Sequence, residues 1–491
     1  MNKHNTSNQT LEGLQECSWG AQVLQKYALT ANNAPIESAI LYPLVGDHPP
    51  IEAYILSLDF GKRALKVGGV DKFADFHART FVDAYAAAKQ LKQQEESGEG
   101  ESIWKVRGPG EAKLSEAFRF GNSALRTAEA LPVNETAAAR LEDPRVRNMT
   151  ICAVIQILQD MKIYPTVYED GMPVLKKLHV VLCIGLPVDD LTRRREETEQ
   201  ALQHLKGEYR IEQFDTKSGK TETWAIEVNG FIPTPQPRGT HYTAMRRLDG
   251  TPALPKKITT VIDIGGGDIY AYEVDSSSGV VVEGQRLGDG TIAIARELIP
   301  LVEDTYGVHI SEAQAQEALH LRTILKGGEE IDISGLLEQL RPRFAHLLTT
   351  VTISKRMLAT FIIFSGGGAA LLHNEIAAKM QALPGQHEVG KDYLILPSAI
   401  APIANCIGLF AHGYYRVQQL IRTKVTEFLE LYESLQALEE KVRAGAAAGS
   451  HPPADQQLAL QEGQERLRKH VGQYYPLIVQ QVRQERRALA G

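Results

Sequence analysis

Two aspartates in this sequence each lie two residues before a glycine, at the end of an apolar stretch. Asp59 precedes Gly61 in LSLDFGKRALKV (56–67), and Asp263 precedes Gly265 in TVIDIGGGDIYAYEV (260–274). Each segment has the pattern of a strand, a tight turn and a second strand. A glycine turn can bring backbone amides against phosphate oxygens because no Cβ blocks the approach. A strand-end carboxylate can hold hydrated Mg²⁺, so two such hairpins facing each other would clamp a polyphosphate. Either segment alone is also compatible with an aspartate that only caps its hairpin.

A third glycine-rich segment follows these two in the chain. FIIFSGGGAAL (361–371) has the pattern of a strand, a glycine turn and the start of a helix. Glycines there let a purine and ribose approach the backbone closely, and a helix N-terminus favours anionic groups. Close packing of a helix on a strand is the alternative explanation. The order of the three segments favours a nucleotide site.

One segment imitates a phosphate-binding motif without its context. SGKT at 218–221 is similar to the end of a P-loop, but Phe214 stands where the first glycine is required. The flanking segments, EYRIEQF and TWAIEVNGF, predict a hairpin around the polar loop 215–222. We therefore expect no P-loop here.

Composition limits the class of protein. The chain has 491 residues, 43% of them hydrophobic and 23% charged, which suits two or three globular domains. The net charge of −7 argues against broad nucleic-acid binding. Four dispersed cysteines and an N-terminus without a signal-peptide pattern suit the cytoplasm. The apolar stretch 394–411 contains Pro397 and Pro402 and predicts a buried strand, turn and helix, so a membrane partner is not expected.

The C-terminal part changes character after Gly413. Apolar residues at three- and four-residue steps predict a long amphipathic helix over 420–442, a break at 444–455 and a second helix over 460–482. A helical hairpin packed on the body and a coiled coil that binds a partner or a second copy are both open. The basic segment VRQERR (482–487) leaves a membrane-surface helix as a third option.

Five motifs in order resemble those of the superfamily of actin, heat-shock chaperones and sugar kinases. These are LDFGKRALKV and TVIDIGGGDIYAYEV as phosphate motifs, VVLCIGLPV (180–188) as first connecting motif, IIFSGGGAAL as adenosine motif and APIANCIGLF (401–410) as second connecting segment. The resemblance implies an α/β, actin-like (ribonuclease H-like) ATPase of two domains with a nucleotide cleft, plus a C-terminal helical extension. Leu186–Pro187, Pro235–Gln236 and LGDGTIAIARELI (287–299) are most similar to ParM-type plasmid-segregation actins and archaeal actin-like proteins.

The resemblance also implies a division of the chain. The expected parts are an N-terminal extension (1–50), domain I (51–188), the remainder of domain I with the crossover (189–257), domain II (258–398), a connecting helix (399–415) and a helical extension (416–491).

Site roles follow from the resemblance, position by position. Asp59 and Asp263 would hold Mg²⁺ through water, and Gln236 would orient the attacking water, so these three are the expected catalytic residues. Gln236 could instead be an exposed loop amide between prolines. The expected nucleotide-binding residues are Gly61, Lys62, Lys66, Gly265, Gly266, Gly267, Glu303, Gly366, Gly367 and Gly368. Asp304 is an alternative to Glu303 near the ribose.

Two positions depart from the superfamily pattern. Lys62 and its neighbour Arg63 stand where relatives carry small hydroxyl residues; they would add charge to the phosphate clamp or point to solvent. Asp268 stands where a threonine is common, which adds a negative charge near the γ-phosphate.

The function implied is ATP hydrolysis, with Mg²⁺ as cofactor and GTP as a possible alternative nucleotide. Nucleotide-dependent assembly into filaments would move plasmid DNA through an adaptor protein, without strong direct DNA binding. A non-polymerising kinase or phosphatase of the same fold is the alternative, and a membrane-linked cytoskeletal scaffold is another.

Overall fold

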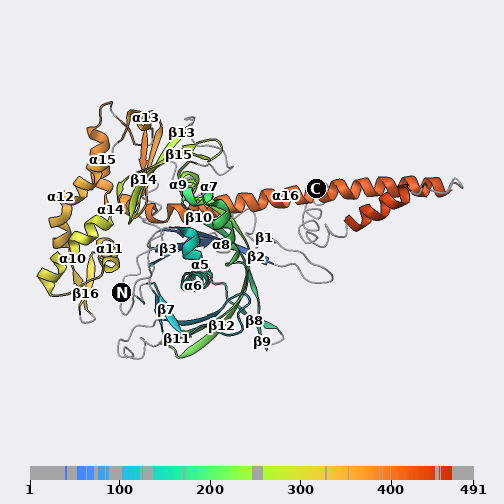
Figure 1. The fold of residues 1–491 in the computed structure, drawn as a ribbon, viewed down its shortest axis with the longest axis horizontal. Coiled ribbons are helices and arrows are strands. Elements are labelled where there is room, and N and C mark those ends of the chain that lie inside the picture. The colour runs from blue at the N-terminus through green and yellow to red at the C-terminus, as the bar shows by residue number, and fades with distance from the viewer. Residues whose placement is uncertain are drawn as a thin grey trace.

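Two β-sheets, joined by two crossing helices, organise the protein in the computed structural model (Figure 1). The residues described are 39–40, 52–61, 64–70, 76–82, 85–87, 102–121, 124, 136–169, 172–245, 258–326, 329–351, 353–385, 387–389, 391–398, 400–447, 453 and 455–466. Most of the expected N-terminal extension, Lys62, Arg63 and the segment 467–491 lie outside this set.

The first sheet has the strand order β4-β3-β2-β10-β12-β11-β6-β7-β5, with β1 beside β2. Hairpin strands β2, β3 and β4 are antiparallel, whereas β10 runs parallel to both β2 and β12. The strands are β1 (Ala39–Ile40), β2 (Glu52–Phe60), β3 (Ala64–Val70), β4 (Phe76–Val82), β5 (Tyr85–Ala87), β6 (Ser102–Arg107), β7 (Phe118–Phe120), β10 (Leu178–Leu186), β11 (Gly207–Asp215) and β12 (Lys220–Pro235). A separate ribbon is formed by β8 (Thr166–Glu169) and β9 (Met172–Leu175).

The second sheet repeats the order of the first five strands. Its order is β15-β14-β13-β18-β19, and again an antiparallel meander is followed by parallel neighbours. Its strands are β13 (Ile258–Ile264), β14 (Asp268–Asp275), β15 (Val281–Asp289), β18 (Phe361–Ser365) and β19 (Tyr393–Ile395), and a small ribbon pairs β16 (Thr323–Lys326) with β17 (Glu329–Asp332). The expected duplication of the phosphate hairpins is therefore part of a duplicated sheet.

Helices cover both sheets. In the first lobe these are α5 (Ala137–Glu142), α6 (Pro144–Asp160), α7 (Val188–Thr192) and α8 (Arg195–Gln203). In the second lobe they are α10 (Ile292–Tyr306), α11 (Glu312–Leu321), α12 (Ser334–Thr350), α13 (Lys355–Leu358), α14 (Gly367–Leu371) and α15 (His373–Ala382). Asp143 caps α6 by accepting a bond from the Arg145 amide, and Pro144 occupies the first turn, where its missing N–H costs nothing.

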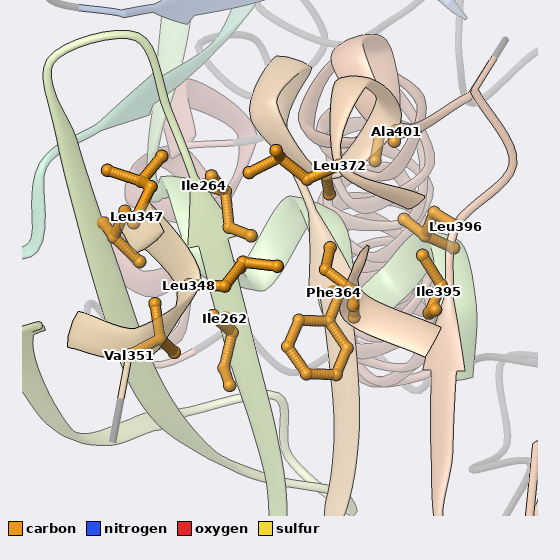
Figure 2. Close-up of a cluster of buried hydrophobic side chains, with 14 of the residues drawn as sticks. Ile262, Ile264, Leu347, Leu348, Val351, Phe364, Leu372, Ile395, Leu396 and Ala401 are labelled. Carbon is orange, nitrogen blue, oxygen red and sulfur yellow. The ribbon is translucent and has the colours of Figure 1, made fainter. Parts of the chain in front are cut away.

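The core of the second lobe lies between its sheet and these helices. Figure 2 shows Ile262 and Ile264 of β13 and Phe364 of β18 facing Leu347 and Leu348 of α12, with Leu372 alongside. Ile262 and Ile264 lie two residues apart and therefore share one face of β13. Burial of this apolar surface fixes the strand ends on which the site residues stand.

Two helices cross between the sheets. The first, α9 (Gln236–Met245), leaves β12 of the first sheet and packs on β13, β14 and β18 of the second. The second, α16 (Ala404–Ala447), leaves β19 through the 3₁₀ turn η1 (Ala401–Ile403) and packs on β2, β3 and β10 of the first sheet. A Cβ at Gly408 would overlap the carbonyl oxygen of Gly239, so the two backbones touch where they cross.

The crossing helices correct one sequence-based assignment. VVLCIGLPV forms β10 and leads into the short helix α7, whereas the helix that connects the lobes follows β12. β10 is apolar throughout because it lies between β2 and β12 and is buried on both faces, not because a connecting helix follows.

The C-terminal helix extends well beyond the body. α16 is 44 residues long and runs without a break through the expected boundary at 415–416 (Figure 1). Residues 455–466 form a second helix that folds back on it, where Leu435 packs on Gly463 and the Gln464 side chain donates to Glu439 at 3.2 Å. We call the distal part of α16 with residues 455–466 the C-terminal arm. None of the helices in the described ranges is long and apolar enough to cross a bilayer.

Candidate nucleotide cleft

The first hairpin, β2–β3, presents a carboxylate and a lysine side by side. Asp59 and Lys66 are cross-strand partners, and the Lys66 ammonium donates to Asp59 Oδ2 at 3.2 Å. The turn between them is closed by the Gly61 amide, which donates to the Asp59 carbonyl at 3.1 Å. From α5, the Arg140 guanidinium donates to the Gly61 carbonyl and lies over the Phe60 ring. The turn is therefore held from both sides.

Asp59 also receives amides from the two crossing helices. Gln236, at the start of α9, donates through Nε2 to Asp59 Oδ1 at 2.7 Å and to the Phe60 carbonyl at 3.0 Å. Asn405, in the first turn of α16, donates to Asp59 Oδ2 at 3.4 Å. Two acceptors around Nε2 fix the orientation of the Gln236 amide, so its carbonyl oxygen points elsewhere.

The second hairpin, β13–β14, is anchored by the start of α10. Gly290, Thr291 and Ile292 donate their amides to the carbonyls of the glycine turn at 2.8–3.1 Å. The acceptors of these bonds are Gly265, Gly266 and Gly267. This turn is rigid because a helix N-terminus, which has spare amide donors, is bonded to it.

In both hairpin turns the glycine lies close to the carbonyl of the residue three positions later. A Cβ at Gly61 would lie 3.0 Å from the Ala64 carbonyl, and a Cβ at Gly265 would lie 3.1 Å from the Asp268 carbonyl. The Gly265 amide donates to that Asp268 carbonyl at 3.0 Å. Both turns therefore close over the same three-residue interval and need the small residue.

The third glycine segment packs against the second hairpin. Gly366 has φ 91°, a left-handed conformation, and a Cβ there would overlap the Asp263 carboxylate. A Cβ at Gly368 would overlap the Ile264 side chain. Close packing, one of the two explanations offered by the sequence, applies here, and these glycines also line the cleft.

All three segments open into one cleft of about 1350 Å³ between the sheets. The lining includes Asp59, Gly61, Lys66, Gln236, Asp263, Gly265, Gly266, Gly267, Gly366, Gly367 and Gly368. One end is lined by α11, α12 and the start of α15 and offers Glu317, His320, Arg341 and Phe344.

Charges in the cleft are strongly coupled. Burial raises the pKa of Asp263 to about 6, although the Lys66 charge opposes this and the Asp59 charge adds to it. Burial acts to lower the pKa of Lys66, but the carboxylates of Asp59 and Asp263 prevail and raise it, so the lysine stays charged. Burial and the Lys66 charge lower the pKa of His320, which is therefore neutral at pH 7.

Glu303 does not reach the cleft, so the ribose role expected for it is wrong. It lies on the outer face of α10, half-exposed, with its carboxylate 3.5 Å from His309. Ile294, Leu298 and Val302 occupy the inner face of this helix. Asp304 is likewise absent from the lining. Glu317, in the following helix, takes the place facing the cleft.

Asp268 does not add a free charge to the phosphate turn. Its carboxylate accepts a bond from Arg286 of β15 at 2.6 Å. Lys62 lies outside the described residues, so its expected contribution is not seen.

Several residues in or next to the cleft were missed from the sequence. Glu317 and His320 line the cleft and Arg140 holds the Gly61 turn, but none of these carries a local motif of its own. Asn405 lies inside the connecting motif APIANCIGLF, but its contact with Asp59 was not expected. The one available signal was the helix start at Ser311, where S-E-A-Q forms a capping box that predicts α11.

The donor set suits a hydrated magnesium ion. The carboxylates of Asp59 and Asp263 are hard oxygen donors, which Mg²⁺ prefers. Among the described residues there is no group of three or more His, Cys, Asp or Glu side chains that could cage a metal. Asp59 and Asp263 would hold the ion through water, as expected for Mg²⁺ that is completed by phosphate oxygens.

Comparison with known proteins locates the fold. No protein-family profile and no curated protein matches the chain. The actin-like protein Alp7A matches at TM-score 0.53 and 12% identity, over 76% of this chain and 98% of Alp7A. An archaeal actin homologue in complex with ADP (TM-score 0.49, 13% identity, 74% and 99%) and Bacillus thuringiensis ParM with ATP (0.49, 12%, 75% and 99%) are also similar. Together with the duplicated sheets and the cleft between them, the match to Alp7A shows that this chain has an actin-like fold.

Proposed function

We propose that the protein binds a purine nucleoside triphosphate in this cleft and hydrolyses its terminal phosphate bond. The observation that carries the proposal is the convergence of Asp59, Lys66, Gln236 and Asp263 on one cleft, from two hairpins and the start of α9. The glycines allow the phosphates to approach both turns, and Lys66 supplies a fixed positive charge between the two carboxylates.

Gln236 orients the attacking water in this proposal. Its Nε2 is committed to Asp59 Oδ1 and the Phe60 carbonyl, which leaves Oε1 to accept a hydrogen bond from a water in the cleft. The side chain is held at the start of α9, so the water is positioned by a rigid element. Positioning is the main catalytic contribution in phosphoryl transfer.

Asp263 accepts the proton of that water. A carboxylate with a pKa raised to about 6 is still ionised at pH 7 and is a stronger base than an ordinary aspartate. Mg²⁺, when bound by water-mediated contacts to Asp59 and Asp263, would neutralise charge on the phosphate oxygens. Lys66 adds to that neutralisation from the first hairpin.

Nucleotide turnover serves self-association in this proposal. Two lobes joined by crossing helices can close on a triphosphate and reopen on the product, and closure changes the outer surfaces. Head-to-tail contacts between copies that do not form a closed ring give a filament. From the motif resemblance, we propose a cytoplasmic filament that moves plasmid DNA through an adaptor protein, with domains I and II divided between residues 257 and 258 as expected from the sequence.

One experiment tests both parts. Phosphate release and pelleting are measured without nucleotide and with Mg-ADP, Mg-ATP and Mg-GTP, for the natural chain, Asp263→Ala and Gln236→Ala. We expect assembly with a triphosphate, persistent assembly with slow phosphate release for Gln236→Ala, and impaired nucleotide binding or assembly for Asp263→Ala. Glu303→Ala is the matched control, since Glu303 lies outside the cleft, and should behave as the natural chain.

Two outcomes would change the conclusion. Nucleotide hydrolysis without pelleting at any protein concentration would favour a kinase or phosphatase of this fold over a filament. Hydrolysis that is unaffected by both cleft substitutions would refute the assigned roles.

A further inference from the structure

A buried chain of hydrogen bonds crosses the junction between the two lobes. Asn405 donates to Asp59 Oδ2 at 3.4 Å, and its Oδ1 accepts from the Thr240 hydroxyl at 2.7 Å and the Thr240 amide at 3.2 Å. The Thr240 hydroxyl also lies 3.3 Å from the Ser365 hydroxyl. Each of the four side chains belongs to a residue less than 9% exposed.

One end of this chain is a carboxylate of the cleft, and the other end lies on the strand next to the second carboxylate. Asp59 is one end itself, in the first sheet. Ser365, at the other end, is the direct strand partner of Asp263 in the second sheet. A buried polar network with every member bonded is rigid, because breaking any link leaves an unpaired group away from water. The chain therefore fixes where Asp59 lies relative to Asp263.

The same chain includes the first turn of α16, the helix whose distal part belongs to the C-terminal arm. Asn405 is the second residue of α16, and the helix continues unbroken to Ala447. At 1.5 Å per residue, 44 residues span about 66 Å. A small displacement at the first turn becomes a large one at the far end, where residues 455–466 pack on the helix.

We propose that Asn405 and Thr240 are positioning residues that set the separation of Asp59 and Asp263 and couple it to the orientation of the C-terminal arm. The inference rests on the proposed hydrolytic function of the cleft. Loss of the chain lets the lobes settle at a different separation, so hydrolysis slows while the nucleotide still binds. The arm then no longer follows the state of the nucleotide.

The competing explanation is that these side chains only fill the contact between α9 and α16. Substitution of Thr243 provides a matched control that tests this explanation. Its hydroxyl is also buried on α9 and also bonds to α16, at 2.7 Å from the Ala404 carbonyl, but it has no bond to Asn405, Asp59 or Ser365 among the described contacts.

The first experiment separates catalysis from binding. Steady-state hydrolysis of Mg-ATP and affinity for a fluorescent ATP analogue are measured for Thr240→Val, Thr240→Ser and Thr243→Val. We expect Thr240→Val to lower kcat about tenfold or more with KM and affinity within about twofold, because a misplacement near 1 Å costs this much or more. Thr240→Ser keeps the hydroxyl, so its kcat should be close to that of the natural chain. The kcat of Thr243→Val should lie within about twofold of the natural value.

The second experiment measures the arm directly. Spin labels at Glu440→Cys on the exposed side of α16 and Lys355→Cys on the second lobe report the distance between them, with Cys17 replaced by serine and the other cysteines buried. We expect the mean distance to differ between ADP and a non-hydrolysable ATP analogue, and Thr240→Val, unlike Thr243→Val, to abolish the difference.

Three results would overturn the inference. One is equal loss of kcat in Thr240→Val and Thr243→Val, and another is a loss in nucleotide affinity that accounts for the whole effect of Thr240→Val. The third is an arm distance that does not depend on the nucleotide in the natural chain. If the natural chain hydrolyses no nucleotide, both the proposed function and this inference fail. If the natural chain is active and Thr240→Val has the same activity, only the proposed coupling is refuted.

Discussion

Replacing Asp263 by asparagine is expected to stabilise the nucleotide-free protein at neutral pH, although it removes a carboxylate of the proposed site. Burial raises the pKa of Asp263 from its ordinary 3.8 to about 6. Between these values the folded protein binds a proton more tightly than the unfolded chain does. Stability from this group therefore falls as pH rises through this window, and the loss is complete above pH 6.

The size of the effect follows from the same pKa. The difference between 3.8 and about 6 corresponds to about 3 kcal/mol of unfavourable free energy at pH 8. Asparagine has nearly the same shape as the protonated aspartate and carries no charge, so it avoids this cost. We expect Asp263→Asn to raise the unfolding free energy by up to about 3 kcal/mol at pH 8 and by less than about 1 kcal/mol near pH 4.

Urea and thermal denaturation between pH 4 and pH 8, without nucleotide or divalent metal, measure this difference. Asp275→Asn is the control of opposite sign, because hydrogen bonds from the Ser277 side chain and from Ser278 lower the pKa of Asp275, which lies at an exposed turn. That substitution should destabilise the protein above pH 4. An Asp263→Asn variant that is less stable than the natural chain at pH 8, or a difference that does not shrink as pH falls, would refute the reasoning.

Two further substitutions test the packing of α16. Gly408→Ala places a Cβ on the Gly239 carbonyl and should destabilise the protein by more than about 3 kcal/mol in urea denaturation. Gly335→Ala is the control, because there is open space around this position in α12, and it should be neutral or slightly stabilising. Equal effects of the two substitutions on stability would contradict the close crossing of α9 and α16. Leu435→Asp should detach residues 455–466 from α16 while nucleotide binding stays unchanged. Hydrogen exchange would detect the detachment as lost protection of the amides of residues 455–466. Retained protection of these amides would contradict the packing of Leu435 on Gly463.

The hairpins of the cleft could be predicted because their information is local. An aspartate, one apolar residue and a glycine at the end of an apolar run specify a strand and the turn that ends it. Asp59 and Asp263 occupy equivalent positions for this reason, and their turns close over the same interval. The order of the motifs along the chain then predicted the actin-like fold, which the match to Alp7A supports.

Residues that reach the cleft from distant segments could not be predicted in the same way. Asn405 contacts Asp59 from 346 positions away. It lies inside the connecting motif APIANCIGLF, but that motif does not specify which residue its side chain contacts. Glu303 shows the opposite error. Its spacing after the second hairpin suggested a ribose contact, but the helix phase that buries Leu298 and Val302 turns Glu303 to solvent, and only the packing of α11 decides which acidic residue faces the cleft.

Gly413 shows why the extent of the last helix could not be predicted. A glycine at the point where composition changes usually indicates a helix end, and a connecting helix over 399–415 was the natural expectation. In the structure Gly413 lies inside α16. A Cβ at this position would lie only 2.8 Å from the Cβ of Cys183 on β10. The glycine permits close packing on the first sheet, at a cost in helix propensity of about 1 kcal/mol. Gly413 was expected to mark the boundary between the body and its extension, but it allows one helix, α16, to pack on the body and continue into the C-terminal arm. The proposed coupling between the cleft and the arm depends on this continuous helix.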